Sequence, residues 1–149
     1  MMYILDTNVV SETRKASRKQ SGPAKATATI DGRVQRWLAS VDSSSLFLSA
    51  VTILELEIGC LLLERRDPAQ GAILRKWIRN HVLVAFSGRV LPIDVAVAQR
   101  CAALHVPDPL EDRDSLIAAT ALVHGMTVVT RNTSHFERTG VALLNPWQY

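Results

Sequence analysis

Residues 3–8 have the sequence Tyr3-Ile4-Leu5-Asp6-Thr7-Asn8, in which a short apolar run ends on an aspartate. The run predicts a buried strand, and Val9 to Arg14 predicts the helix that follows it. A carboxylate at the end of a buried strand is held rigidly at the edge of a sheet, where open α/β folds build their sites. Because Asn8 can cap the following helix, Asp6 is free for another task, and we interpret it as a functional residue.

Two other apolar segments carry a single acid in the same way. Ser49 to Glu55 ends on Glu55, and Asp114 to Ala119 begins with Asp114. Three carboxylates that converge from distant segments repel one another unless a cation lies between them. We therefore expect Asp6, Glu55 and Asp114 to hold a divalent metal ion, and their hard oxygen ligands favour Mg²⁺ or Mn²⁺.

Glu55 has a second interpretation. The segment Thr52-Ile53-Leu54-Glu55 matches the capping box, in which a glutamate folds back onto the amide of the N-cap residue. Glu57 is the other acid in this turn, but it lies about 200° around the helix from Glu55. The residues alone leave the cap role and the ligand role of Glu55 equally open.

Asp114 is aligned with the apolar stripe of its predicted helix. Three apolar residues follow it at intervals of three, four and seven positions: Ile117, Ala118 and Ala121. An acid that shares a buried stripe needs a partner. Asp112 competes with Asp114 as a ligand, but a role in the first helical turn explains it adequately.

Asn132 and His135 follow the fourth predicted strand. Thr130-Arg131-Asn132 places Asn132 where a further acid would be natural, and its amide oxygen can orient water or coordinate a metal weakly. His135 is assigned to a helix end or to solvent, because no Cys/His pair has zinc-ligand spacing. Asp94 is expected to cap the helix that carries Val97 and Cys101.

Five short apolar segments are expected to form strands, with helical segments between them. The expected strands are residues 3–5, 46–48, 90–93, 126–130 and 142–144. Strands that alternate with helices predict a parallel sheet with helices on both faces. Pro92 places the third strand at an edge, or near a strand end. With 149 residues, the chain is expected to form a single domain, residues 1–149.

Positive charge is concentrated between Arg14 and Arg36, where seven basic residues accompany one acid, Asp31. This window carries +6, whereas the rest of the chain sums to −3. Residues 17–29 are rich in Ser, Thr, Ala and Lys, and they predict a basic loop or insertion at about 15–30. A basic patch beside an acidic site suits a polyanion bound through its phosphates, and a solvated loop is the alternative.

The apolar runs are far shorter than a membrane span, and the N-terminal residues lack the regions of a signal peptide. A cytoplasmic location without membrane association is therefore expected. Cys60 and Cys101 both lie in apolar helical surroundings, which predicts buried free thiols.

Together these residues resemble the PIN-domain ribonucleases, and most closely the VapC- and FitB-like toxins of bacterial toxin–antitoxin pairs. The resemblance covers almost the whole chain and keeps the order of the family's motifs. Its segments are Leu5 to Glu12, Leu48 to Gly59, Val90 to Asp94, Asp114 to Ala121, Val129 to Asn132 and Gly140 to Trp147.

The resemblance implies a three-layer α/β/α sandwich around a parallel sheet of about five strands. It maps the family's acidic site onto Asp6, Glu55 and Asp114, and the fourth position, often Asp, onto Asn132. It further implies an Mg²⁺- or Mn²⁺-dependent endoribonuclease that cuts RNA and forms a homodimer. A cognate antitoxin would block the site and would be the only link to operator DNA.

Two other functions compete with this interpretation. A phosphatase of the haloacid dehalogenase type also starts from an aspartate after a strand, but it needs a second acid where this chain has Asn8. The other alternative is a catalytically weak or inactive PIN-fold module that binds RNA or a protein partner. Asn132, in place of an acid, is the feature that favours it.

Overall fold

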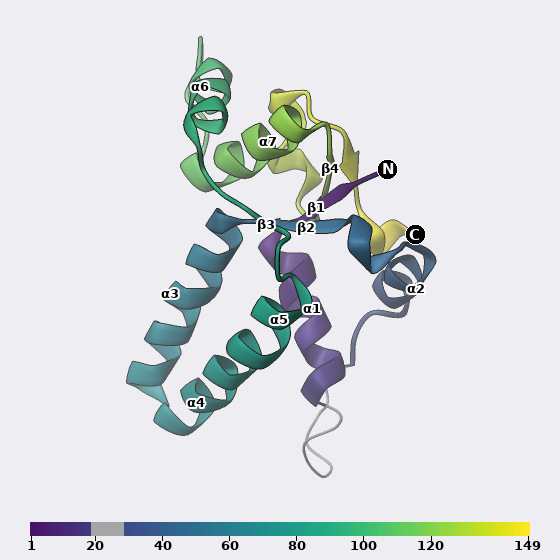
Figure 1. Cartoon of the computed structure of the whole chain (residues 1–149), viewed down its shortest axis with the longest axis vertical. Coiled ribbons are helices and arrows are strands. Elements are labelled where there is room, and N and C mark those ends of the chain that lie inside the picture. The colour runs from purple at the N-terminus through teal and green to yellow at the C-terminus, as the bar shows by residue number, and fades with distance from the viewer. Residues whose placement is uncertain (19–28) are drawn as a thin grey trace.

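The computed structural model describes residues 1–18 and 29–149, and its centre is a sheet of five parallel strands (Figure 1). The spatial order of the strands is β3-β2-β1-β4-β5, with every neighbouring pair parallel. The strands are β1 (Tyr3–Leu5), β2 (Leu46–Ser49), β3 (Val90–Leu91), β4 (Thr127–Val129) and β5 (Leu143–Leu144). The predicted parallel sheet is confirmed, and β3, which precedes Pro92, is an edge strand as predicted.

Helices cover both faces of the sheet, which confirms the predicted three-layer architecture (Figure 1). One face carries α1 (Thr7–Arg18), α2 (Gly32–Ser40), α3 (Ala50–Arg66), α4 (Pro68–Trp77) and α5 (Leu83–Ala85), with a π-helical turn at Ile78–Val82 between the last two. The other face carries α6 (Val95–Leu104) and α7 (Asp112–His124). Short 3₁₀ turns lie at Ser43–Ser45, Thr133–His135, Glu137–Thr139 and Pro146–Gln148.

The alternation of side chains along the strands explains the two helical layers. Leu5 and Val129 point into the core shared with α1 to α4, whereas Ile4 and Val128 point into the core shared with α7. All four are at most 1% exposed. The central strands β1 and β4 are therefore apolar on both sides, as a parallel sheet covered on both faces requires.

Three helix ends are formed by residues that favour such positions, among them the predicted cap at Asp94. The carboxylates of Asp31 and Asp94 cap α2 and α6 by accepting from backbone N–H groups of the first helical turn. Gly125 ends α7 with a φ of +66°, a left-handed conformation that favours glycine. Cys60 and Cys101 are buried free thiols, as predicted.

Two predictions about the first helix are wrong. The helix begins at Thr7, two residues earlier than a cap at Asn8 allows, and the backbone oxygen of Asp6 accepts from Val9 and Val10. The helix also continues to Arg18, so the start of the predicted basic loop at 15–30 is helical. Residues 19–28, which hold the rest of that predicted loop, lie outside the described residues.

The long helix α3 and the following α4 form an antiparallel hairpin that is packed closely at Gly71. A Cβ at Gly71 would lie 2.5 Å from Cα of Glu64, so a side chain does not fit there. Arg75 on α4 forms ion pairs with Glu57 and Glu64 on α3.

Within the described residues, no helix is both long and apolar enough to cross a membrane.

The strand order brings the carboxyl ends of β1 and β4 side by side at one edge of the sheet. The chain runs from β1 outward through β2 to β3 and then returns to the other side of β1 as β4, which creates a switch point between β1 and β4. Asp6 directly follows β1, and its backbone N–H donates to the oxygen of Val129 at 2.9 Å. Thr130 directly follows β4, so both residues lie at the same edge.

Candidate metal-dependent active site

Asp6 is the most firmly held acid at this edge. It is 6% exposed, and its carboxylate accepts hydrogen bonds from three groups. The backbone N–H of Thr7 donates to Oδ1 at 2.8 Å, and Asn8 Nδ2 and Thr130 Oγ1 donate to Oδ2 at 3.2 and 2.8 Å. Three donors fix the orientation of the carboxylate before any ligand binds.

Asn8 and Thr130 join the strand end at Asp6 to the loop after β4. The Asn8 amide donates to Thr130 Oγ1 at 3.2 Å, and its oxygen accepts from the backbone N–H of Arg131 at 3.3 Å. Thr130 Oγ1 also accepts from the backbone N–H of Asn132 at 3.0 Å. The backbone of Asn132 is thus tied to Asp6 through one hydroxyl, while its side chain is exposed.

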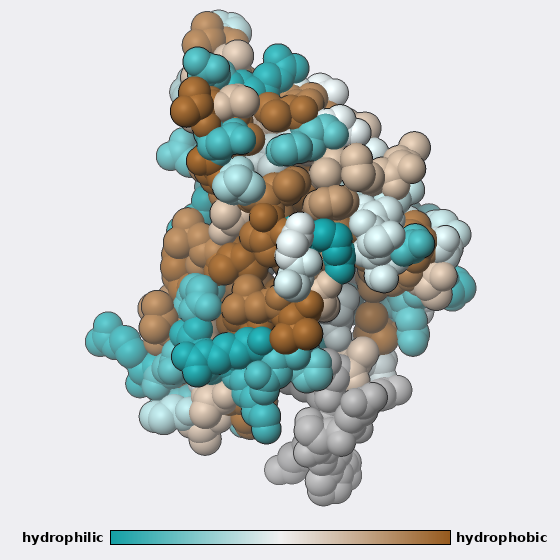
Figure 2. Space-filling view, in the orientation of Figure 1, coloured by the Kyte–Doolittle hydropathy of each residue, from teal (hydrophilic) through white to brown (hydrophobic). Residues whose placement is uncertain are grey.

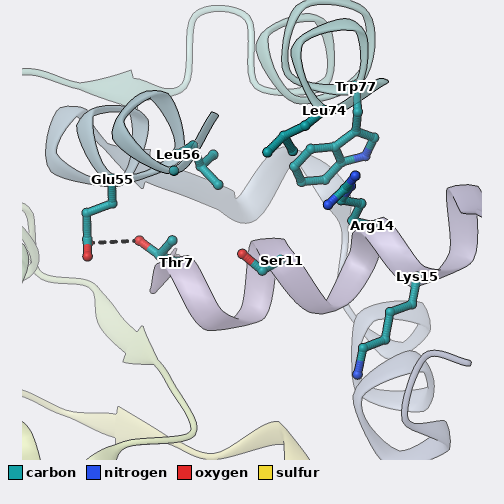
Figure 3. A pocket seen from close by; sticks show the side chains of 9 residues that line it. Thr7, Ser11, Arg14, Lys15, Glu55, Leu56, Leu74 and Trp77 are labelled. Atoms are coloured by element: carbon teal, nitrogen blue, oxygen red, sulfur yellow. Dashed lines mark hydrogen bonds between the residues drawn. The ribbon is translucent and has the colours of Figure 1, made fainter. Parts of the chain in front are cut away.

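Glu55 belongs to the second turn of α3 and is not a helix cap. The cap of α3 is Ser49, whose hydroxyl accepts from the N–H of Val51 at 3.0 Å, so the helix begins before Thr52. The capping-box interpretation of Glu55 is therefore wrong. Glu55 Oε1 instead accepts from Thr7 Oγ1 at 2.9 Å (Figure 3), which brings it next to Asp6.

Asp114 lies in the first turn of α7, on the side that packs against the sheet. Its backbone N–H donates to the cap residue Glu111, and the stripe that it begins is buried, with Ile117, Ala118 and Ala121 all 0% exposed. Its carboxylate lies 3.3 Å from Nδ1 of His135, and the Asp114 side chain is 24% exposed. The predicted alignment of Asp114 with the buried stripe is confirmed.

The pKa directions show that these three acids lie within electrostatic reach of one another. Burial raises the pKa of Asp6, Glu55 and Asp114. The charge of Asp6 raises the pKa of Glu55 and Asp114 further, and the charge of Asp114 adds to the rise at Glu55. Opposing shifts come from the Thr130 hydroxyl at Asp6, the Thr7 hydroxyl at Glu55 and His135 at Asp114.

Glu55 and Asp114 border a common pocket of about 560 Å³. Three basic side chains line it as well, namely Arg113, His135 and Arg138. Arg113 lies 3.9 Å from Glu55, and Arg138 lies 3.8 Å from Asp108. A pocket that combines carboxylates with arginines offers separate partners for a cation and for a phosphate.

The donor chemistry of this site fits a hard divalent cation. Asp6, Glu55 and Asp114 supply carboxylate oxygens from three elements of the fold, the ligand type that Mg²⁺ and Mn²⁺ prefer. Among residues 1–18 and 29–149, no group of three or more Asp, Glu, His or Cys side chains is placed so that it could hold a metal ion in this conformation. To bind one ion together, the three carboxylates would have to come closer to one another, and the charge of the ion would compensate their repulsion.

Sequence reasoning missed the residues that hold these acids in place. The hydroxyl of Thr7 donates to Glu55, and the hydroxyl of Thr130 donates to Asp6. His135, assigned above to a helix end or to solvent, pairs with Asp114. The signal for Thr130 was available, because a residue directly after β4 must share an edge with Asp6. His135 ends a 3₁₀ turn after β4, and nothing in the sequence determines the direction in which that turn points.

Known proteins that are similar to this chain match along its whole length. Residues 3–142 match the family model of the PIN domain. The chain is 35% identical to VapC ribonuclease Y4jK of Sinorhizobium fredii, over 99% of each chain. It is 34% identical to the Toxin FitB of Neisseria gonorrhoeae, over 98% of this chain and 99% of that protein.

The fold also matches a solved structure of a FitB complex. The crystal structure of FitAcB from Neisseria gonorrhoeae contains a chain that superposes with a TM-score of 0.80 at 34% identity. The match covers 99% of this chain and 100% of that one. From the family model and from full-length relatives above 30% identity, we conclude that this protein belongs to the PIN-domain family.

Proposed function

We propose that this protein is an Mg²⁺- or Mn²⁺-dependent endoribonuclease that acts as the toxin of a toxin–antitoxin pair. One observation carries the proposal. Thr7 donates to both Asp6 and Glu55, and the charge of Asp6 raises the pKa of both Glu55 and Asp114, which supports a shared site for the three acids. Such an arrangement is costly for folding unless a cation compensates it. The names of the relatives, a ribonuclease and a toxin, support RNA as the substrate.

Each residue of the proposed site would have its own role. Asp6, with its fixed carboxylate, and Asp114 would hold the ion, and Glu55 would complete its acidic side. Asn132 would contribute a neutral amide from the loop after β4. Arg113 and Arg138, which line the same pocket, would contact phosphate oxygens of the RNA.

Hydrolysis of a phosphodiester requires water to form a new bond to phosphorus while the bond to one ribose oxygen breaks and that oxygen takes up a proton. A bound divalent ion supplies a Lewis acid that stabilises charge on the phosphate and makes water a better nucleophile. Glu55 faces the pocket as a carboxylate with a raised pKa, and it can orient water or accept its proton. The arginines keep the phosphate in place against the repulsion of the three acids.

An antitoxin partner is proposed on the basis of the solved complexes. The two solved structures at 34% identity are those of FitAcB from Neisseria gonorrhoeae and of FitAB bound to a DNA fragment. By this similarity, a cognate antitoxin would cover the site of this chain and would provide any contact with operator DNA. We also propose a homodimer, in keeping with the resemblance to the toxin family.

An exposed apolar surface is available for such partners. Figure 2 shows apolar side chains gathered over α3 and α5 on one face of the molecule. Four large apolar residues of α3 and α5 are more than half exposed, namely Leu54, Leu61, Leu62 and Val84, at 51, 57, 60 and 66%. Exposed apolar surface of this extent is typical of a protein–protein interaction site. Light scattering of the purified chain, alone and with its antitoxin, tests both partners.

The catalytic proposal is tested by incubating purified protein with a labelled single-stranded RNA. Cleavage is expected with Mg²⁺ or Mn²⁺, and it should stop when EDTA is added and return when the metal is restored. The Asp6→Asn variant is the control for a contaminating nuclease. Cleavage that persists in EDTA, or that is equal in the variant, would contradict the proposal.

The alternative is a PIN-fold module that binds RNA or a protein without cutting. Asn132 favours it, because a neutral amide replaces the acid that often occupies this position in the family. Such a module has no need of a divalent ion at Asp6 and Asp114. Calorimetric titration with Mn²⁺ separates the two functions independently of any RNA substrate.

A further inference from the structure

A second pocket, of about 270 Å³, also borders Glu55 (Figure 3). It lies between α1, α3 and α4, and the acidic residues other than Glu55 do not line it. Its volume is slightly below the range of roughly 300–1,000 Å³ that is typical of small-molecule sites. The pocket therefore suits a unit as small as one nucleotide or one side chain.

The α1 wall of this pocket is polar and positively charged. Four residues of α1 line the pocket, at positions separated by four, three and one residues: Thr7, Ser11, Arg14 and Lys15. This spacing places them along one face of the helix. Lys15 Nζ lies 2.8 Å from the buried carboxylate of Glu12, which compensates its charge, and Figure 3 shows Lys15 extending away from Arg14 and Trp77. The hydroxyl groups of Thr7 and Ser11 and the guanidinium of Arg14, on one helical face, suit a phosphate group.

The opposite wall is apolar and partly open. Leu56 on α3 and Leu74 and Trp77 on α4 form it, and Figure 3 shows Arg14 extending toward the Trp77 ring. Gly59 lines the pocket without a side chain, and a Cβ at this position would meet nothing within 4 Å. An apolar wall that faces a cationic one matches the two chemical halves of a nucleotide, the base with its sugar and the phosphate.

We infer that this second pocket binds the RNA nucleotide next to the one whose phosphate is cleaved. The inference rests on the proposed nuclease function and adds a substrate subsite to it. Glu55 lines both pockets, so a strand that extends from the acidic pocket into this one passes directly over Glu55. Arginines line both pockets along the path of this RNA strand. Arg113 and Arg138 line the acidic pocket, and Arg14 lines the second pocket.

The charge of the pocket is tested with a matched pair of variants at Ser11, Ser11→Glu and Ser11→Gln. The two new side chains have the same size, and only the glutamate repels a phosphate. Cleavage is measured on an RNA oligonucleotide and on bis(p-nitrophenyl) phosphate with Mn²⁺, a diester too small to reach both pockets. Ser11→Glu is expected to reduce kcat/KM for RNA about tenfold more than Ser11→Gln does, as befits one charged contact, with a smaller difference on the small diester.

The space in the pocket is tested with Gly59→Leu, which places a side chain in the opening. Ala72→Leu is the control, because it adds the same group at an exposed position of α4 outside the pocket. Gly59→Leu is expected to raise KM for RNA and to weaken RNA binding measured by fluorescence anisotropy in Ca²⁺. Ala72→Leu is expected to change neither, and thermal melting checks that each variant is folded.

The outcomes separate the subsite from the nuclease proposal. If Ser11→Glu and Ser11→Gln bind and cleave RNA equally, and Gly59→Leu behaves like Ala72→Leu, the subsite is wrong even though the enzyme is active. If the wild type cleaves neither substrate, the nuclease proposal fails, and the anisotropy measurement still decides whether RNA enters the pocket. If Gly59→Leu leaves RNA binding intact but weakens the purified antitoxin complex, the pocket binds a protein side chain and the RNA assignment is overturned.

Discussion

The strand end that carries Asp6 and the helix start that carries Asp114 hold their carboxylates in different ways. Asp6 is 6% exposed and accepts from Thr7, Asn8 and Thr130, whereas the Asp114 side chain is 24% exposed and pairs with His135, itself 57% exposed. Asp6 is thus oriented by the buried hydroxyl of Thr130 and by two partly buried groups that follow it directly in the chain. Asp114 pairs with a solvent-facing side chain that can move away. We call Asp6 with its three donors the rigid half of the site, and Asp114 with His135 the adjustable half. A ligand that contacts both carboxylates would hold the two halves together.

The largest expected effect is on cleavage by Asp6→Asn and Asp114→Asn. Each change removes one negative charge from the proposed ion site, and each is expected to reduce RNA cleavage by at least about 10³-fold, comparable to the loss of a main electrostatic group in other enzymes. Cleavage is measured with labelled RNA at several Mg²⁺ concentrations. Wild-type activity in either variant would show that the substituted aspartate is not part of the active site.

The same two variants also distinguish the rigid half from the adjustable half through their stability. An amide at position 114 relieves repulsion and keeps a polar contact with His135, so the melting temperature without metal is expected to rise. An amide at position 6 points a donor group toward donors that Asp6 now accepts from, which offsets the relief. A larger gain for Asp6→Asn than for Asp114→Asn would reverse the assignment of the two halves.

Glu55→Gln is expected to reduce cleavage more than Glu57→Gln does, by about tenfold or more if Glu55 handles the attacking water. Glu57 is the matched control, since it lies on the same helix but pairs with Arg75 on α4. Rates at saturating Mg²⁺ decide the comparison. Equal rates in the two variants would leave Glu55 as a structural partner of Thr7.

The pH dependence of stability is a smaller effect with a definite sign. The pKa of Asp6, Glu55 and Asp114 is raised in the folded state, so these groups stabilise the metal-free fold most fully below their unfolded pKa of about 4. That contribution is lost as pH rises through the raised values. In EDTA, the stability advantage of Asp114→Asn over the wild type is therefore expected to grow between about pH 4 and pH 7. An advantage that shrinks over this range would contradict the assigned shifts.

The smallest effect is expected for Asn132→Asp. Its backbone is tied to Asp6 through Thr130, and its side chain is exposed, so an added carboxylate should strengthen the attraction for a divalent ion moderately. The Mg²⁺ concentration for half-maximal cleavage is expected to fall about two- to fivefold, less than 1 kcal/mol. No change in metal affinity or in cleavage would place the side chain of residue 132 away from the ion.

The sequence was sufficient to predict the parallel sheet with its helices and the positions of two of the acids, at a strand end and on a helix stripe. Apolar runs that alternate with helical segments predicted the parallel sheet, and the strand end at Leu5 and the apolar stripe of α7 pointed to Asp6 and Asp114. These features are local, because a strand end and a helix face follow from a few neighbouring residues.

The roles that remained open or were wrong depend on contacts between distant segments. Thr52 to Glu55 has the composition of a capping box, but Ser49 starts the helix earlier, and only the packing of α1 against α3 brings Glu55 to Thr7. The contact of His135 with Asp114 likewise depends on the orientation of a 3₁₀ turn relative to α7. Neither orientation is encoded in a local pattern.

Calorimetric titration of the metal-free protein with Mn²⁺ tests the central claim most directly, because it needs neither the RNA substrate nor the antitoxin. The wild type is expected to bind about one ion per chain at neutral pH, with the affinity falling as the carboxylates take up protons at lower pH. Asp6→Asn and Asp114→Asn should each weaken that binding strongly, whereas Glu57→Gln should not. Identical binding curves for the wild type and both aspartate variants would show that the converging acids do not form a metal site.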